Sequence, residues 1–176
     1  MKKIIVYIAM SLDGYVADAT GGVSWLGGDG SDPENFGSYP EFIETIDTVI
    51  LGYSTYHQIV TELSPDEWAY KGKKSYVLTH RIMENTEEIT FISEDITELS
   101  KRLKAEEGKS IWICGGADII RQFHQKGLID EYSLTVIPTI LGGGVRLFDG
   151  ESQETQLKLE STKCYNGMVD LVYKKR

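Results

Sequence analysis

The feature that most constrains the fold is the alternation of short apolar segments with amphipathic ones along the chain. Nearly uninterrupted apolar segments such as Lys2–Ala9, Asp47–Leu51 and Ser110–Cys114 are typical of strands buried on both faces. By contrast, Asp95–Glu107 places its apolar residues at helical spacing, with acids early and basic residues late. This alternation predicts an α/β fold: a three-layer α/β/α arrangement around a mostly parallel central sheet.

The same patterns place the remaining elements. We expect further helices at 39–46, 54–63 and 117–125, and further strands at 74–79, 89–93 and 132–137. Leu157–Cys164 and Met168–Lys174 flank an Asn-Gly pair, which is a strong turn signal. They predict an antiparallel hairpin at the C-terminal edge of the sheet. With neither a linker nor a repeat in between, residues 1–176 are expected to form a single domain.

The charge balance excludes several classes of partner. The net charge is −9 and the pI is about 4.8, and because the basic residues form no stripe we expect no nucleic acid partner. No apolar segment is long enough to cross a bilayer, so no membrane partner is expected. The apolar N-terminal segment is too short for a signal peptide, since Asp13 follows it closely, and a cytoplasmic location is expected.

Cysteine content is low. Cys114 and Cys164 are too few for a disulfide framework or a zinc cluster. Both lie in predicted strands, which favours two buried thiols over a redox role. The sequence predicts no metal site.

Ligands of open α/β sheets bind at the carboxyl ends of the strands, and two strand ends here share one pattern. Gly115-Gly116 follows a strand and opens a helix with Ala117 and Asp118. Glycine lets a diphosphate approach the backbone, and a helix start offers free N–H groups. A tight strand-to-helix turn needs glycine as well, so the pair alone is weak. The spacing is not that of the G-x-G-x-x-G fingerprint, so a Rossmann site is not predicted.

The second of these ends is Gly52, followed by Ser54 and Thr55, whose hydroxyl groups either cap the helix or bind phosphate. At a third strand end, the run Thr79-His80-Arg81 brings a hydroxyl, an imidazole and a guanidinium together. In so acidic a chain, which repels anions at long range, this run is the best local anion site. Arginine suits a phosphate monoester, although a solvated loop is the alternative for this run taken alone.

Residues 21–30 form a loop, since five of the ten are glycine. Trp25 and Leu26 are out of place in a flexible linker, which has no use for apolar bulk. The segment therefore fits a mobile loop that closes on a bound ligand.

Four segments in order resemble one known family: Ile5–Gly14, Val49–Tyr56, Ile113–Asp118 and Ile137–Phe148. The last contains Pro138 and the glycines of an L-G-x-G pattern and is the most specific. Over essentially its whole length the chain resembles the dihydrofolate-reductase-like superfamily, and most closely its riboflavin-biosynthesis reductase (RibD C-terminal domain) branch.

The resemblance implies an NADPH-dependent reductase. Such an enzyme transfers a hydride to a carbonyl or imine carbon of a small pyrimidine- or pterin-like substrate, as 5-amino-6-(5-phosphoribosylamino)uracil reductase does. NADH remains possible as the cofactor. Homodimers are common in this branch, so the resemblance also implies a homodimer. The zinc deaminase motifs H-x-E and P-C-x-x-C are absent, so only the reductase half is implied.

The resemblance also assigns the cofactor site. The nicotinamide would lie against Ala9, Gly14 and Gly115. The diphosphate and the adenosine end would contact Gly116, Ala117, Asp118, Gly52, Ser54, Thr55, Thr79, His80 and Arg81. Family members often place an arginine where this chain has Tyr53. That departure weakens the preference for NADPH over NADH and puts more weight on Arg81.

By the same resemblance, Leu12, Trp25, Phe36 and Tyr56 are candidate walls of a substrate pocket, with core packing as the alternative. No general acid is evident, so the catalytic residue is unknown. Asp13 is the nearest carboxylate, and a structural role in its Asp-Gly turn is the alternative for it.

Dihydrofolate reductases hold the pterin with a buried carboxylate on the first helix. Here the matching position falls near Phe36, and the nearest acids, Asp32, Glu34 and Glu41, do not occupy it. This argues against folate as the substrate. A dihydrofolate reductase with a relocated acid and a non-catalytic nucleotide-binding dimeric module remain the two alternatives.

Overall fold

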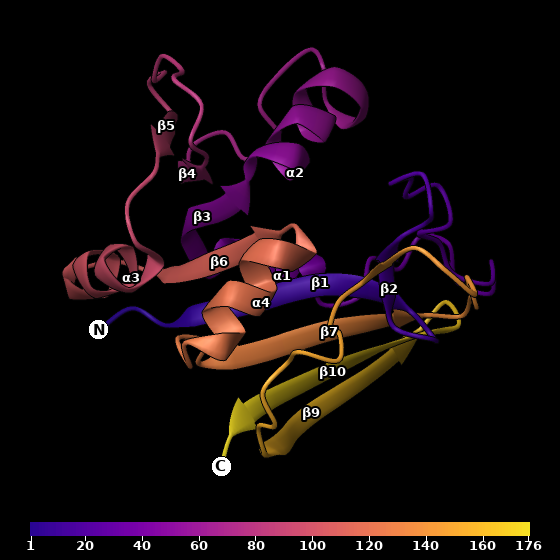
Figure 1. Cartoon of the computed structure of the whole chain (residues 1–176). Helices are drawn as coiled ribbons and strands as arrows, with labels where there is room; N and C mark the ends of the chain where they lie inside the picture. The colour runs from indigo at the N-terminus through magenta and orange to yellow at the C-terminus, as the bar shows by residue number, and fades with distance from the viewer.

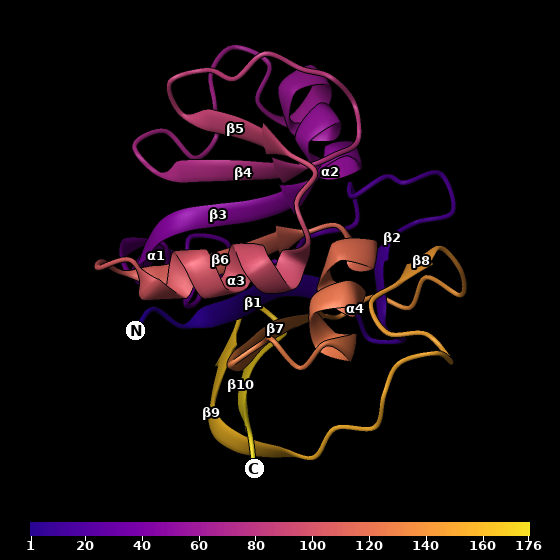
Figure 2. The same cartoon turned by 60° about the vertical axis from the view of Figure 1, so that its left-hand side comes forward.

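A computed structural model describes all residues from 1 to 176. Eight strands form one sheet in the order β5-β4-β3-β6-β1-β7-β10-β9, which Figure 2 shows from top to bottom. The strands are β1 (Ile4–Ser11), β3 (Ile46–Gly52), β4 (Lys74–Leu78), β5 (Ile89–Ile92), β6 (Ser110–Gly115), β7 (Glu131–Ile137), β9 (Leu157–Tyr165) and β10 (Met168–Lys175). The first six in the sheet order are parallel, and β10 and β9 are antiparallel. The predicted sheet with its C-terminal edge hairpin is confirmed.

Helices cover both faces of this sheet. They are α1 (Tyr39–Glu44), α2 (Tyr53–Gln58), the π-helical turn η1 (Ile59–Leu63), α3 (Ile96–Ala105) and α4 (Ala117–Gln125). Along β1, Ile4 and Val6 pack with α3 and α4 in the larger core, and Ile5 and Tyr7 pack on the opposite face. Figure 1 shows α4 in front of the sheet, and Figure 2 shows α3 on the same side. The three-layer prediction is therefore confirmed.

The helix α3 shows how the sequence sets an element. The Asp95 carboxylate accepts a hydrogen bond from the Thr97 backbone N–H at 2.8 Å and so caps the helix start. Leu99 and Leu103, one turn apart, are fully buried against the sheet. No helix of the protein combines the length and the apolar character needed to cross a membrane.

Two details differ from the sequence-based expectations. The predicted helix at 54–63 is α-helical only to Gln58, and its last turn is π-helical, with the Ser64 N–H donating to the Ile59 carbonyl at 2.8 Å. The prediction that both cysteines are buried is wrong for Cys164, which is exposed, whereas Cys114 is half-buried. It lies on β9, an edge strand with a neighbour on one side only.

A small second sheet joins β2 (Tyr15–Ala17) to β8 (Val145–Arg146). Near these places the sequence indicated only the Asp-Gly turn and the glycines of the L-G-x-G pattern, and no strand. Gly144 makes the pairing possible, because a Cβ there would lie 2.1 Å from the Ala17 carbonyl oxygen and its φ is +130°. Such a contact between distant segments leaves no periodic signal in the sequence.

A buried carboxylate joins the hairpin to the first helix. Asp170, on β10, is 2% exposed. Its Oδ1 accepts from the Thr135 hydroxyl at 2.6 Å and the Tyr165 hydroxyl at 3.0 Å, and its Oδ2 accepts from the backbone N–H and the hydroxyl of Ser38. The Tyr7 hydroxyl lies 3.1 Å from that of Ser38. This network fixes the chain just before α1.

Candidate functional site

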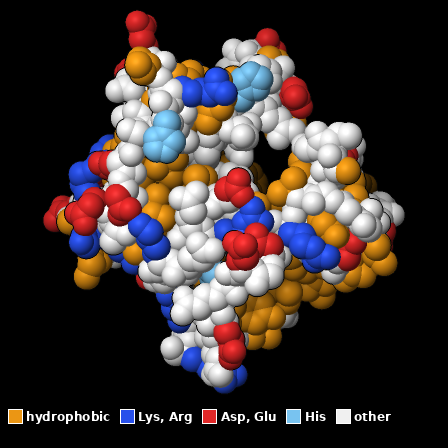
Figure 3. Space-filling view, viewed as in Figure 1, with side chains coloured by type: hydrophobic (Ala, Val, Ile, Leu, Met, Phe, Trp, Pro, Cys, Tyr) orange, Lys and Arg blue, Asp and Glu red, His pale blue; other side chains and the backbone are white.

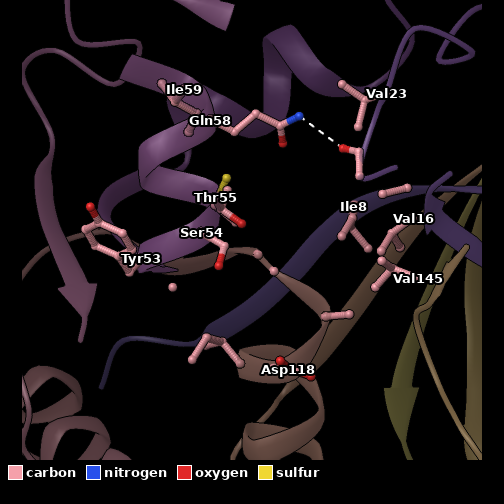
Figure 4. Close-up of a pocket in the computed structure, with 18 of the residues that line it drawn as sticks. Ile8, Val16, Val23, Tyr53, Ser54, Thr55, Gln58, Ile59, Asp118 and Val145 are labelled. Atoms are coloured by element: carbon pink, nitrogen blue, oxygen red, sulfur yellow. Dashed lines mark hydrogen bonds between the residues drawn. The ribbon is translucent and has the colours of Figure 1, made fainter. Parts of the chain in front are cut away.

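A cavity of about 670 Å³ opens where the carboxyl ends of β1, β3 and β6 meet. Helices α2 and α4 form two of its walls, and the segment after β2 forms another. Figure 4 shows these walls through Ser54 and Gln58 of α2, Asp118 of α4 and Val23 of that segment. The space-filling view is hollowed between α2 and that segment (Figure 3). Of the 24 residues that line the cavity, 15 are hydrophobic, so it is suited to a flat, mostly apolar ligand with a few polar anchors.

The cavity brings together eight of the twelve cofactor residues expected from the sequence. They are Ala9, Gly52, Ser54, Thr55, Gly115, Gly116, Ala117 and Asp118. Thr79 and His80 line a smaller adjoining hollow of about 360 Å³ at the ends of β4 and β5. Gly14 and Arg81 line neither. The expected nicotinamide, diphosphate and adenosine positions thus follow one another along the sheet edge.

Glycines let the two helix starts approach each other. A Cβ on Gly52 would lie 3.0 Å from Ile119 Cγ1, and one on Gly116 would lie 3.2 Å from Thr55 Oγ1. Gly52 and Gly116 are the N-caps of α2 and α4, and no side chain caps either helix. Their first N–H groups are therefore free to donate to an anion between them. This cradle fits a diphosphate and would be filled by larger side chains.

Asp118 contributes to this cradle through its backbone only. Its side chain is 82% exposed and pairs with Arg121, which also pairs with Asp149 at 2.9 Å. The carboxylate adds negative charge at the rim, which would repel a phosphate. An N–H contact is consequently the one favourable interaction that Asp118 can offer a diphosphate.

At the adenosine end, the basic side chains beside the hollow are already paired. Lys126 lies 2.7 Å from Asp95, and Arg102 lies 2.5 Å from Glu94. Arg81 has no ion-pair partner, and its guanidinium lies over the Tyr53 ring at 4.4 Å from the centroid. Tyr53, at the position where the resemblance implied an arginine, therefore supports the unpaired cation of this region.

None of the four candidate substrate residues lines the cavity. Leu12 and Phe36 are 63% and 68% exposed. Tyr56 packs edge-on against Phe91, with ring centroids 5.1 Å apart, so core packing accounts for it. The half-buried Trp25 donates from its indole to the Gly22 carbonyl at 3.1 Å.

The predicted mobile loop does border the cavity, through neighbours of Trp25. Gly21, Val23 and Leu26 are part of the lining. Gln58 Nε2 donates to the Gly21 carbonyl at 3.1 Å, which joins the loop to α2 (Figure 4). At its far end, the Asn166 side chain accepts from the backbone N–H groups of Gly30 and Asp32. The loop is thus held at both ends.

Four polar lining residues were missed by the sequence analysis: Gln58, Tyr70, Cys114 and Gln122. The Tyr70 hydroxyl lies 3.0 Å from Cys114 Sγ in the cavity wall. Burial raises the pKa of the Cys114 thiol to about 11, and burial also raises the pKa of the Tyr70 hydroxyl well above its ordinary value. Both groups therefore keep their protons at neutral pH. Gln58 lies one helical turn after Ser54, and that spacing was a usable signal. Tyr70 lies in an irregular segment without periodicity.

Asp13 has a structural role. Its carboxylate accepts from the Ser11 hydroxyl at 2.6 Å and from the backbone N–H groups of Leu141 and Gly142 at 3.1 and 2.8 Å. These hydrogen bonds, that of Ser11 foremost, lower the pKa of Asp13 to about 2. The group is ionised at neutral pH and does not line the cavity, so it is poorly suited to be the proton donor.

Known proteins share both the sequence and the fold. Residues 2–173 match the family described as RibD C-terminal domain. The chain is 41% identical to the uncharacterized protein YwjB of Bacillus subtilis (strain 168) over 175 residues, covering 98% of this chain and 97% of the relative.

Two solved structures resemble the whole chain. A protein of Shewanella sp. PV-4, whose name assigns it provisionally to riboflavin biosynthesis, has a TM-score of 0.84 at 27% identity, with 99% of both chains covered. The Thermotoga maritima diaminohydroxyphosphoribosylaminopyrimidine deaminase/5-amino-6-(5-phosphoribosylamino)uracil reductase has a TM-score of 0.74 at 15% identity, with 99% of this chain and 57% of that chain covered. The resemblance seen in the four sequence segments is confirmed, and the chain belongs to the RibD C-terminal domain family.

Proposed function

We propose that this protein is an NADPH-dependent reductase that delivers a hydride to a carbonyl or imine carbon of a small molecule. The observation that carries the proposal is the glycine cradle between α2 and α4, which opens into a largely apolar cavity. Its geometry suits a diphosphate held by backbone N–H groups, and membership of the RibD C-terminal domain family supports a reductase.

Bound NADPH would supply the hydride from C4 of its nicotinamide. The chain would orient the ring between Ala9 and Gly115, which border the cavity at the ends of the adjacent strands β1 and β6. The loop at Val23 and Leu26 would exclude water from the reacting carbon. Tyr70 and Cys114, both protonated, are placed to donate a hydrogen bond to the oxygen or nitrogen that accepts the proton.

The proposed preference for NADPH over NADH depends on Arg81. Its guanidinium has no ion-pair partner and is held by the Tyr53 ring beside the expected adenosine end. Arginine binds a phosphate monoester more readily than a ribose hydroxyl. Exchange of Arg81 for alanine should therefore reduce the affinity for NADPH and leave that for NADH nearly unchanged.

The folate alternative has little support at the level of the side chains. Asp170 is the one buried acid of the chain. Each of its carboxylate oxygens already accepts two hydrogen bonds, from Thr135, Tyr165 and Ser38. A carboxylate has about four acceptor positions, so none is left for a pterin. Asp170 is thus a poor candidate for the relocated acid.

A cofactor titration tests the proposal and its non-catalytic alternative. Tryptophan fluorescence would follow binding of NADPH and NADH to the wild type, Ser54→Asp and Ser161→Asp. An aspartate at the start of α2 suits the helix but should weaken NADPH binding about tenfold or more by repelling the diphosphate. Ser161, exposed on β9, adds the same charge far from the cavity. Absence of NADPH binding to the wild type would contradict the proposal, and binding without any hydride transfer would favour the non-catalytic module.

We further propose that the protein forms a homodimer through the outer part of the sheet. On the face shared by β10 and β9, Val169 pairs with Cys164, Leu171 with Thr162 and Tyr173 with Leu159, and none of these side chains is charged. Hydrophobic side chains gather over β7 and β10 in the lower right of Figure 3. A second copy, itself at −9, could approach these three uncharged pairs without close like-charge contacts. Analytical sedimentation of two variants tests this proposal. Leu159→Glu places a charge on the proposed face and should make the protein monomeric, whereas Ser161→Glu places it on the other face and should leave the dimer intact.

A further inference from the structure

The part of the cavity that a bound dinucleotide would leave free is apolar. The proposed cofactor covers the glycines and the two helix starts. The remaining wall comes from β1, β2, β8, the loop after β2 and the inner side of α2 and η1. Its apolar side chains include Ile8, Val16, Val23, Leu26, Ile59 and Val145, several of which lie together opposite α2 in Figure 4.

No cationic side chain reaches this wall. The chain has 18 Lys and Arg and three His residues, and none of them lines the cavity. The one charged lining residue is Asp118, an acid at the rim. A phosphate or carboxylate on a substrate would therefore lose its hydration without gaining a counter-charge, which is strongly unfavourable.

Of the cations next to or near the lining in sequence, Lys71 is exposed beside Tyr70, and Arg146 and Arg121 are engaged elsewhere. The Arg146 guanidinium, next to Val145, lies over the Tyr15 ring at 4.7 Å from the centroid. Arg121 pairs with both Asp118 and Asp149. With a net charge of −9, the molecule also repels an anionic substrate before it arrives.

The diphosphate of the cofactor does not meet this difficulty. It would be held by backbone N–H groups at the starts of α2 and α4, and the free part of the cavity contains no further helix start. Besides Gln122 on α4, which also lines the adjoining hollow, the polar side chains that remain are Gln58, Tyr70 and Cys114. Their hydroxyl, thiol and amide hydrogens suit a neutral carbonyl or imine acceptor.

We propose, on the basis of the reductase function argued above, that the substrate is a small uncharged carbonyl or imine compound. The reaction in the name of the Thermotoga maritima relative uses a phosphoribosyl compound, and this cavity lacks the charge to hold its phosphate. Hydride from NADPH adds to the carbon, one proton adds to the oxygen or nitrogen, and NADP⁺ is left.

Matched pairs of ligands test this. Three aldehydes of aliphatic, aromatic and heteroaromatic type would each be offered to the NADPH complex as a neutral methyl ester and as the corresponding carboxylate. Binding would be followed by tryptophan fluorescence and turnover by NADPH absorbance. We expect at least one ester to bind and every carboxylate to bind on the order of 100-fold more weakly or not at all. Equal or tighter binding of the carboxylates, or no binding of any ester while NADPH binds, would overturn the proposal.

A charge placed in the wall gives an independent test. Leu26 lines the cavity and is 43% exposed, so Leu26→Arg adds a cation without opening the core. Ile82→Arg adds the same charge at a fully exposed position outside the cavity. Carboxylate ligands should bind about tenfold more tightly to the first variant and not to the second; no gain with Leu26→Arg would overturn the proposal. Failure of NADPH itself to bind would instead reject the reductase function.

Discussion

Removal of the Asp170 carboxylate should be the most damaging single change in the molecule outside the cores. The side chain is 2% exposed and accepts hydrogen bonds from Thr135, Tyr165 and, twice, Ser38. In Asp170→Ala these donors lose their acceptor, and those that water cannot reach stay unsatisfied. At roughly 1 kcal/mol or more for each buried unsatisfied group, we expect a loss of about 3–5 kcal/mol.

Single-donor variants calibrate this value. Thr135→Val and Tyr165→Phe each remove one of the donors, both 8% exposed or less, and should each cost about 1 kcal/mol. The free energy of unfolding of a small domain is only about 5–15 kcal/mol. Asp170→Ala should therefore lower the midpoint urea concentration by a large fraction, while the dependence of the free energy on urea concentration stays unchanged. Urea titration followed by far-UV circular dichroism measures it. A loss for Asp170→Ala no greater than that for Thr135→Val would refute the reasoning, because the network would then not act as a unit.

Three further predictions address pH, thiol access and backbone strain. Hydrogen bonds hold the pKa of Asp13 at about 2, below its value in the unfolded chain. The carboxylate therefore stabilises the fold above the unfolded pKa of about 4, and this effect is lost as the pH falls through 2. The melting temperature of Asp13→Asn should drop less on acidification than that of the wild type, and equal drops would contradict this prediction. In a Cys164→Ser background, NADPH should slow alkylation of Cys114 by about tenfold, because a nicotinamide against the neighbouring Gly115 would narrow the access to this lining thiol; an unchanged rate in mass spectrometry would mean that the nicotinamide does not lie against Gly115. Gly144→Ala should cost about 2–4 kcal/mol, since its Cβ would meet the Ala17 carbonyl at 2.1 Å, whereas Gly142→Ala, with open space around it, should cost about 1 kcal/mol; equal losses in thermal unfolding would argue against the clash.

The fold could be predicted because its signals are local. The apolar segment that became β1 and the spacing of Leu99 and Leu103 in α3 are set by burial against neighbours in a regular layer. The meeting of eight expected cofactor residues in one cavity was predictable for a related reason: parallel strands place their carboxyl ends at one sheet edge, so residues at and after the ends of β1, β3 and β6 must meet.

The substrate side was less predictable because it is built from irregular segments. Tyr70 reaches the cavity from a stretch without periodicity, and Val145 reaches it from β8, a strand of two residues. Tyr56 was a plausible wall residue by position, yet the rotation of α2 turns it to Trp68 and Phe91 in the core. Such directions depend on tertiary packing, which single-sequence patterns do not encode.

The clamp formed by Asn166 has a consequence for protein engineering. The turn at 165–167, an Asn-Gly hairpin tip, resembles a convenient surface site for an inserted tag or new chain termini. Here the Asn166 side chain holds the N–H groups of Gly30 and Asp32, and its carbonyl accepts from Asp29. An insertion at this tip would release the far end of the loop that borders the cavity.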